Sequence, residues 1–142
     1  KGYGKEVKKN KIPDNYYYLI INPNIQLSTK AVFKTFSECA DLRNETKYMF
    51  FENIKIYNSL LLSAISLAPQ ISDILKKLKK MPDIIAYGMT GSGSTCFGIF
   101  KNLDDISYIS KIFKKEHFIW YGRKSNYNLN RVSSSKMLEN NF

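Results

Sequence analysis

The residues best suited to chemistry in this sequence form a short segment rich in glycine and hydroxyl side chains, residues 87–95 (YGMTGSGST). Glycines leave the backbone uncovered, so that successive N–H groups can converge on an oxyanion such as a phosphate. The segment lacks the Gly-Lys-Ser/Thr ending of a P-loop, and no helix follows it as a dinucleotide fingerprint requires. Residues 87–95 taken alone are equally consistent with a phosphate-binding loop and with a tight turn that has only a structural role.

The elements around this segment are expected to be strands. Residues 84–89 lead into it and residues 95–100 lead out, and so short a Gly/Ser connection predicts an antiparallel hairpin. The aromatic and β-branched run at residues 16–21 predicts a central strand or one covered on both faces, ending at the Asn-Pro-Asn of residues 22–24. A last strand is expected at residues 117–121.

Helices are expected between and after these strands. Ser28 is expected to cap a short helix with three apolar residues on one side: Val32, Phe33 and Phe36. Residues 37–48 are expected to form a loop. Apolar residues recur at three and four positions over residues 48–80, which predicts two helices divided by Pro69. A final helix is expected over residues 104–113, capped by an aspartate.

This order of elements predicts an α+β domain of the ferredoxin-like kind, a small antiparallel sheet with helices packed on one face. The domain is expected over residues 16–124, after a connecting loop at residues 1–15 and before a polar, frayed tail at residues 125–142. A length of 142 residues with 44% hydrophobic residues suits one domain with a real core.

Composition excludes some classes of function and leaves others open. The net charge of +10 favours anionic partners such as nucleotides, phosphorylated metabolites or nucleic acid, without choosing among them. The longest apolar run, residues 60–68, is far shorter than the ~20 residues that cross a bilayer, so no membrane span is expected. Cys39 and Cys96 lie far apart without a CxxC pattern, which predicts two buried free thiols in a reducing, cytoplasmic setting.

Two stretches carry a resemblance to a known family. Residues 88–98 (GMTGSGSTCFG) resemble the third glycine motif of the GHMP small-molecule kinases. Residues 17–33 (YYLIINPNIQLSTKAVF) are similar to the strand, proline turn and capped helix that open the C-terminal domain of one family among them, the 4-diphosphocytidyl-2-C-methyl-D-erythritol kinases. Residues 58–60 (NSL) stand where that family usually has Asn-Asp-Leu, and residues 2–5 (GYGK) resemble its Gly-x-Gly-Glu interdomain loop.

The resemblance, which runs from about residue 2 to about residue 123, implies the C-terminal half of an ATP-dependent kinase. Such kinases phosphorylate the 2-hydroxyl of a cytidine-diphosphate-linked methylerythritol in the non-mevalonate isoprenoid pathway. Their N-terminal domain carries a Gly-rich ATP loop and a catalytic Lys/Asp pair, and nothing in this sequence matches either. ATP and Mg²⁺ are therefore expected to be bound mainly by an N-terminal kinase domain as partner, and this chain alone is expected to be inactive.

The resemblance also implies roles for individual residues. Phe33 aligns with an aromatic residue that stacks on the cytosine ring, the alternative being a core residue on a short helix. Thr29, beside the expected cap, is expected to contact the diphosphate, although capping alone would also explain a hydroxyl there. The glycine loop is expected to face a phosphate through five residues: Gly91, Ser92, Gly93, Ser94 and Thr95. No catalytic or metal-binding residue is assigned to this chain.

Two alternatives of other classes remain open at this stage. One is a ferredoxin-like RNA-binding module that uses the net positive charge and surface tyrosines, and the other is a ligand-binding domain without catalysis. Nucleic acid is the less favoured partner, because the sequence contains no RNP-like Gly-Phe-x-Phe array. The sequence does not determine the oligomeric state.

Overall fold

The computed structural model describes residues 16–41, 47–102, 109, 111–113, 115 and 117–123. Nine elements lie in these ranges: β1 (Tyr17–Asn22), α1 (Thr29–Glu38), β2 (Tyr48–Phe51), β3 (Ile54–Tyr57), α3 (Leu61–Leu67), α4 (Gln70–Lys79), β4 (Ile84–Met89), β5 (Cys96–Phe100) and β6 (Phe118–Arg123). The expected connecting loop at residues 1–15, the tail at 125–142 and the first turn of the last expected helix, residues 104–108, lie outside the described residues.

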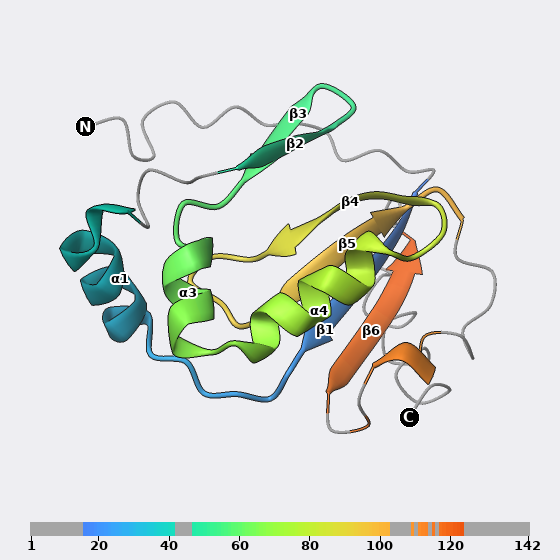
Figure 1. Ribbon diagram of the computed structural model, residues 1–142. Coiled ribbons are helices and arrows are strands. Elements are labelled where there is room, and N and C mark those ends of the chain that lie inside the picture. The colour runs from blue at the N-terminus through green and yellow to red at the C-terminus, as the bar shows by residue number, and fades with distance from the viewer. Residues whose placement is uncertain are drawn as a thin grey trace, which may run out of the picture.

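Four strands form an antiparallel sheet in the order β4-β5-β1-β6. β1 is central, as its uninterrupted apolar sequence predicts, with Leu19 paired to Gly98 on one side and to Tyr121 on the other. β4 and β5 form the expected antiparallel hairpin. Figure 1 shows the sheet with α4 lying across one face of it and α1 beside α3 at one end.

The main core lies between this face and the two helices α3 and α4. Leu19, Ile21 and Phe100 project from the sheet into it and are fully buried. From α4 they meet Ile71, Ile74 and Leu78, whose spacing of three and four places them on one side of the helix. The α+β class with helices on one face of a small antiparallel sheet is thereby confirmed, and Pro69 separates α3 from α4 as expected.

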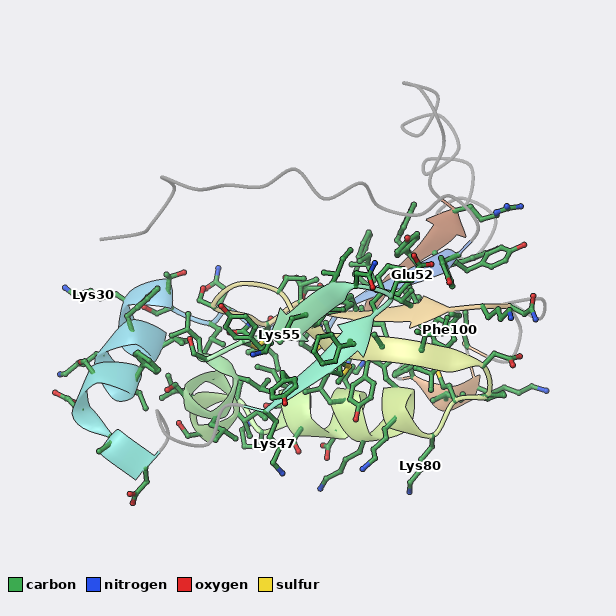
Figure 2. The ribbon with its side chains drawn as sticks, turned by 90° about the horizontal axis from the view of Figure 1, so that it is seen from above. Lys30, Lys47, Glu52, Lys55, Lys80 and Phe100 are labelled. Carbon is green, nitrogen blue, oxygen red and sulfur yellow. The ribbon has the colours of Figure 1, made fainter. Side chains whose placement is uncertain are left out.

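Residues 48–57 form a hairpin and not the start of a helix, so that part of the helical expectation was wrong. β2 and β3 pair antiparallel, and Phe51 packs on Ala86 and Ile99 against the second face of the sheet. Figure 2 shows this hairpin over the sheet, with Glu52 at its turn and Lys55 along it. Aromatic and β-branched residues dominate the segment and favour strands, which outweighs an apolar spacing that also fits a helix.

α1 begins as the sequence predicts, with Ser28 Oγ accepting from the Ala31 amide at 3.1 Å. Val32 enters the core, but Phe33 is 52% exposed, so the expectation that both lie on one side was wrong. Adjacent residues on a helix point about 100° apart, because one turn takes 3.6 residues. Cys96 is buried, which raises the pKa of its thiol to about 12, whereas Cys39 is exposed, contrary to expectation.

Candidate functional site

The loop that joins β4 to β5, residues 90–95, is called the glycine loop here and contains both glycines with positive φ among the described residues. The Thr90 amide donates to the Thr95 carbonyl at 2.8 Å, and the Gly93 amide donates to the Thr90 carbonyl at 3.0 Å. Gly91 has φ +52° and open space around it. Gly93 has φ +92°, and a Cβ there would lie 2.9 Å from the Met89 sulfur. Only glycine therefore fits at position 93, for conformational and steric reasons together.

Two hydroxyls of the glycine loop contact the end of β1 and the segment that follows it. Ser94 is 5% exposed, and its Oγ donates to the Ile25 carbonyl at 3.2 Å. Thr95 Oγ1 accepts from Asn22 Nδ2 at 2.9 Å. These contacts join parts of the chain about seventy residues apart. They anchor the loop, and the hydrogen of the Ser94 hydroxyl is donated to the Ile25 carbonyl.

The outer part of the glycine loop meets the N-terminus of α1. Ser92 Oγ lies 3.0 Å from Thr29 Oγ1. In the described part of the chain, the amides of Gly91 and Ser92 donate to no other protein group. α1 has ten residues and no acidic side chain in its first turn, so its amide end keeps the positive end of the helix dipole uncompensated. The N-terminus of α1 and the outer part of the glycine loop thus lie side by side, and groups of these kinds suit an anion.

Phe33 lies one turn after Thr29 on α1, and residues at this spacing share a helix face about 5–6 Å apart. Because Val32 occupies the core, the Phe33 ring is accessible. A ring, a hydroxyl and a pair of amides therefore follow one another along the surface, in the order Phe33, Thr29 and the glycine loop. Lys30 is exposed and extends from α1 at the end of the molecule (Figure 2).

Two asparagines for which the sequence predicts no role at the site hold the two ends of the glycine loop. Asn58 Nδ2 donates to the Met89 and Gly91 carbonyls, each at 2.8 Å. Asn22, as described above, donates to Thr95. The Oδ1 atom of each asparagine also accepts a hydrogen bond from the backbone amide two residues later. This contact makes an Asx-turn, a local turn that the asparagine in the sequence can signal. That signal predicts a local turn but not the distant loop that the side chain reaches.

The residues at this site do not fit a metal ion. Within the described ranges, no group of three or more His, Cys, Asp or Glu side chains is placed to hold one. The glycine loop and the start of α1 offer N–H groups and hydroxyls, whereas Mg²⁺ binds carboxylate, phosphate and water oxygens. Donors of this kind suit an anion better than a cation. Among the described residues, no helix is long and apolar enough to cross a membrane.

Comparisons with known proteins identify relatives of this chain. Residues 34–119 match the family model described as GHMP kinases C terminal. The chain is similar to three proteins named 4-diphosphocytidyl-2-C-methyl-D-erythritol kinase, from Bartonella tribocorum (26% identical, 85% of this chain and 43% of the relative), Prochlorococcus marinus strain MIT 9515 (28%, 70% and 37%) and Anaplasma marginale (30%, 84% and 44%). The chain thus spans less than half the length of these relatives.

Proposed function

Since the chain belongs to the GHMP kinase C-terminal family, we propose that it forms one wall of the substrate site of a 4-diphosphocytidyl-2-C-methyl-D-erythritol kinase. The reaction proposed is transfer of the γ-phosphoryl group of ATP to the 2-hydroxyl of the cytidylyl substrate. The observation that carries the proposal is the contact between Thr29 and Ser92, because it places a helix N-terminus beside a glycine loop. Two amides of that loop have no protein partner among the described residues.

In this proposal the chain binds and orients the substrate. The diphosphate lies between the start of α1 and the amides of Gly91 and Ser92, and the cytosine ring stacks on Phe33 one helical turn away. This order matches the order of base and diphosphate in the substrate. The exposed ring of Phe33 supports stacking, since a core role would bury it.

The catalytic machinery and the ATP site are proposed to come from a domain that corresponds to the remaining length of the relatives. Phosphoryl transfer needs bound phosphates, a metal ion and a group that aligns the nucleophile. Because this chain offers an anion site without a carboxylate, we expect the chain alone to release no ADP from ATP above a buffer control. Substrate-dependent ADP release by these 142 residues would contradict this division of roles.

The direct test is a titration of the ¹⁵N-labelled chain with cytidine 5′-diphosphate, followed by amide chemical shifts. The expected shifts lie at Thr29, Phe33, Gly91 and Ser92. Inorganic pyrophosphate should reproduce the shifts in the glycine loop, and cytidine should reproduce only those near Phe33. A folded chain whose shifts on addition of cytidine 5′-diphosphate lie elsewhere would contradict the proposed site.

A second candidate function, binding of single-stranded RNA, draws on a different surface. Tyr48, Phe50 and Tyr57 are all more than half exposed on the outer side of the β2–β3 hairpin, and Lys55 Nζ lies 4.3 Å from the Tyr48 ring centroid. Accessible rings beside a cation suit base stacking. If this function holds, oligouridylate should shift the hairpin amides, and Tyr57→Ala should abolish those shifts without affecting the response to cytidine 5′-diphosphate.

A further inference from the structure

Asn58 uses every hydrogen-bonding group of its side chain within the chain. The two Nδ2 hydrogens are donated to the carbonyls of Met89 and Gly91, both at 2.8 Å. The Oδ1 atom accepts from the Leu60 amide at 2.9 Å, just before α3 begins. A half-buried carboxamide with all three bonds made is held in one orientation.

This orientation controls the direction of one particular amide. The peptide bond between Gly91 and Ser92 is trans, so the Gly91 carbonyl and the Ser92 N–H point in opposite directions from one rigid plane. Asn58 holds the carbonyl side of that plane. The Ser92 N–H is therefore turned away from Asn58, and it donates to no protein group in the described part of the chain.

Glycine at position 91 makes such a support necessary. No atom lies within 4 Å of the place where a Cβ would be, so packing does not restrain this residue. Glycine also populates more backbone conformations than any other residue. Without Asn58, the bond from the Gly93 amide to the Thr90 carbonyl still closes the turn, but the Gly91–Ser92 peptide plane inside it can flip. An amide that points in more than one direction binds an anion weakly.

We propose that Asn58 is a positioning residue that aims the Ser92 amide at the bound anion. The identity of that anion as the substrate diphosphate rests on the proposed function, but the orientation of the amide is a property of the ligand-free chain. Asn58 touches no substrate in this proposal, and it acts only through the Gly91 carbonyl.

Asn22 provides a matched control at the other end of the loop. Its Nδ2 donates to the Thr95 hydroxyl, which can donate as well as accept. In Asn22→Asp the hydroxyl can therefore rotate and donate to the new carboxylate, and the contact is kept. In Asn58→Asp the carboxylate faces two carbonyl oxygens, which cannot donate. Both substitutions add one negative charge and keep the Oδ1 acceptor, so they differ mainly in whether the loop contact survives.

The experiment compares the unsubstituted chain, Asn58→Asp and Asn22→Asp by ¹⁵N relaxation without ligand and by titration with inorganic pyrophosphate. In Asn58→Asp we expect the order parameter of the Ser92 amide to fall from about 0.85 to below about 0.6, while Asn22→Asp keeps the higher value. We expect pyrophosphate to bind Asn58→Asp about tenfold more weakly than Asn22→Asp, as loss of one or two hydrogen bonds allows. Equal order parameters in the two variants, or equal affinities when both variants bind pyrophosphate, would overturn the proposal.

Two further outcomes separate this proposal from the proposed function. If pyrophosphate binds none of the three proteins but only Asn58→Asp loosens Ser92, the anion site is contradicted and the positioning of the amide is supported. If Asn58→Asp does not fold, the unsubstituted chain decides the question through its Asn58 side-chain N–H groups. Scalar couplings across hydrogen bonds to the Met89 and Gly91 carbonyls support the proposal, and their absence overturns it.

Discussion

The glycine loop between β4 and β5 and the turn between β2 and β3 both reverse the chain between antiparallel strands, but different parts of the molecule hold them. The β2–β3 turn consists of Glu52 and Asn53, and Glu52 adopts φ +53° without being glycine. One side-chain contact from outside the hairpin reaches this turn in the described residues, from the Tyr16 hydroxyl to Glu52 Oε2 at 2.7 Å. The pairing of β2 with β3 maintains this turn.

The glycine loop is instead held from outside its own strands. Asn22 and Asn58 reach its two ends, and Ser94 is anchored to the Ile25 carbonyl. These supports leave the amides of Gly91 and Ser92 without a partner in the described part of the chain. The comparison indicates that local strand pairing suffices to make a turn, whereas supports from distant segments hold a loop whose amides are unpaired in the described part of the chain.

The largest effect is expected at the two glycines with positive φ in the glycine loop. Gly93→Ala should lower the free energy of unfolding by about 3 kcal/mol or more, because φ is positive and the new Cβ would press on Met89 and Leu27. The control Gly91→Ala meets open space, and its positive φ alone should cost about 1–2 kcal/mol. Urea denaturation measures both values. Equal losses would show that contacts at position 93 relax freely.

The next largest effect concerns two exposed phenylalanines, Phe33 on α1 and Phe50 on the β2–β3 hairpin. Phe33→Ala should weaken binding of cytidine 5′-diphosphate by about 1–3 kcal/mol, as loss of base stacking does elsewhere. Phe50→Ala, on the hairpin and of similar exposure, should leave that affinity unchanged. Isothermal titration gives the affinities, and thermal melting shows whether either variant is destabilised. A lower Tm for Phe33→Ala with unchanged affinity would make the ring a packing residue.

A smaller effect separates two serines within the glycine loop. Ser94→Ala leaves the Ile25 carbonyl without its donor and should cost about 1 kcal/mol of stability. Ser92→Ala should leave stability unchanged and weaken pyrophosphate binding, because the Ser92 hydroxyl lies at the proposed anion site beside Thr29. Reversed results, with Ser92 affecting stability and Ser94 affecting binding, would mean that the loop presents its other side to the ligand.

The smallest effect is expected at the β2–β3 turn. The hydrogen bond to Glu52 raises the pKa of Tyr16 above its ordinary value, with burial and the carboxylate charge adding to it. A pKa raised by folding means that the contact contributes fully below about pH 10 and is lost as tyrosinate forms at higher pH. Tyr16→Phe should therefore change Tm little at pH 7, and any difference should disappear above pH 10. A large loss at pH 7 would show that the hairpin depends on this contact.

Much of the fold follows from local patterns in the sequence. The apolar run at β1 predicts a central strand, the apolar spacing predicts α3 and α4 with Pro69 between them, and Ser28 predicts the start of α1. The hairpin at residues 48–57 was missed because its aromatic residues fit a helical spacing as well as two short strands. Strand propensity of these residues and the packing of Phe51 on Ala86 and Ile99 together favour the strands, and the spacing along the chain does not reveal that packing.

The candidate site also depends partly on local sequence patterns and partly on tertiary contacts. The sequence alone determines that residues 90–95 form a turn with little side-chain cover, and that a capped helix begins near Thr29, because both depend on neighbours along the chain. Tertiary structure decides that Thr29 meets Ser92, that Ser94 is anchored inside while Phe33 remains accessible, and that Asn58 reaches Gly91. These contacts join residues 33 to 69 positions apart, and a hydrogen bond between such distant residues depends on how the sheet and helices pack.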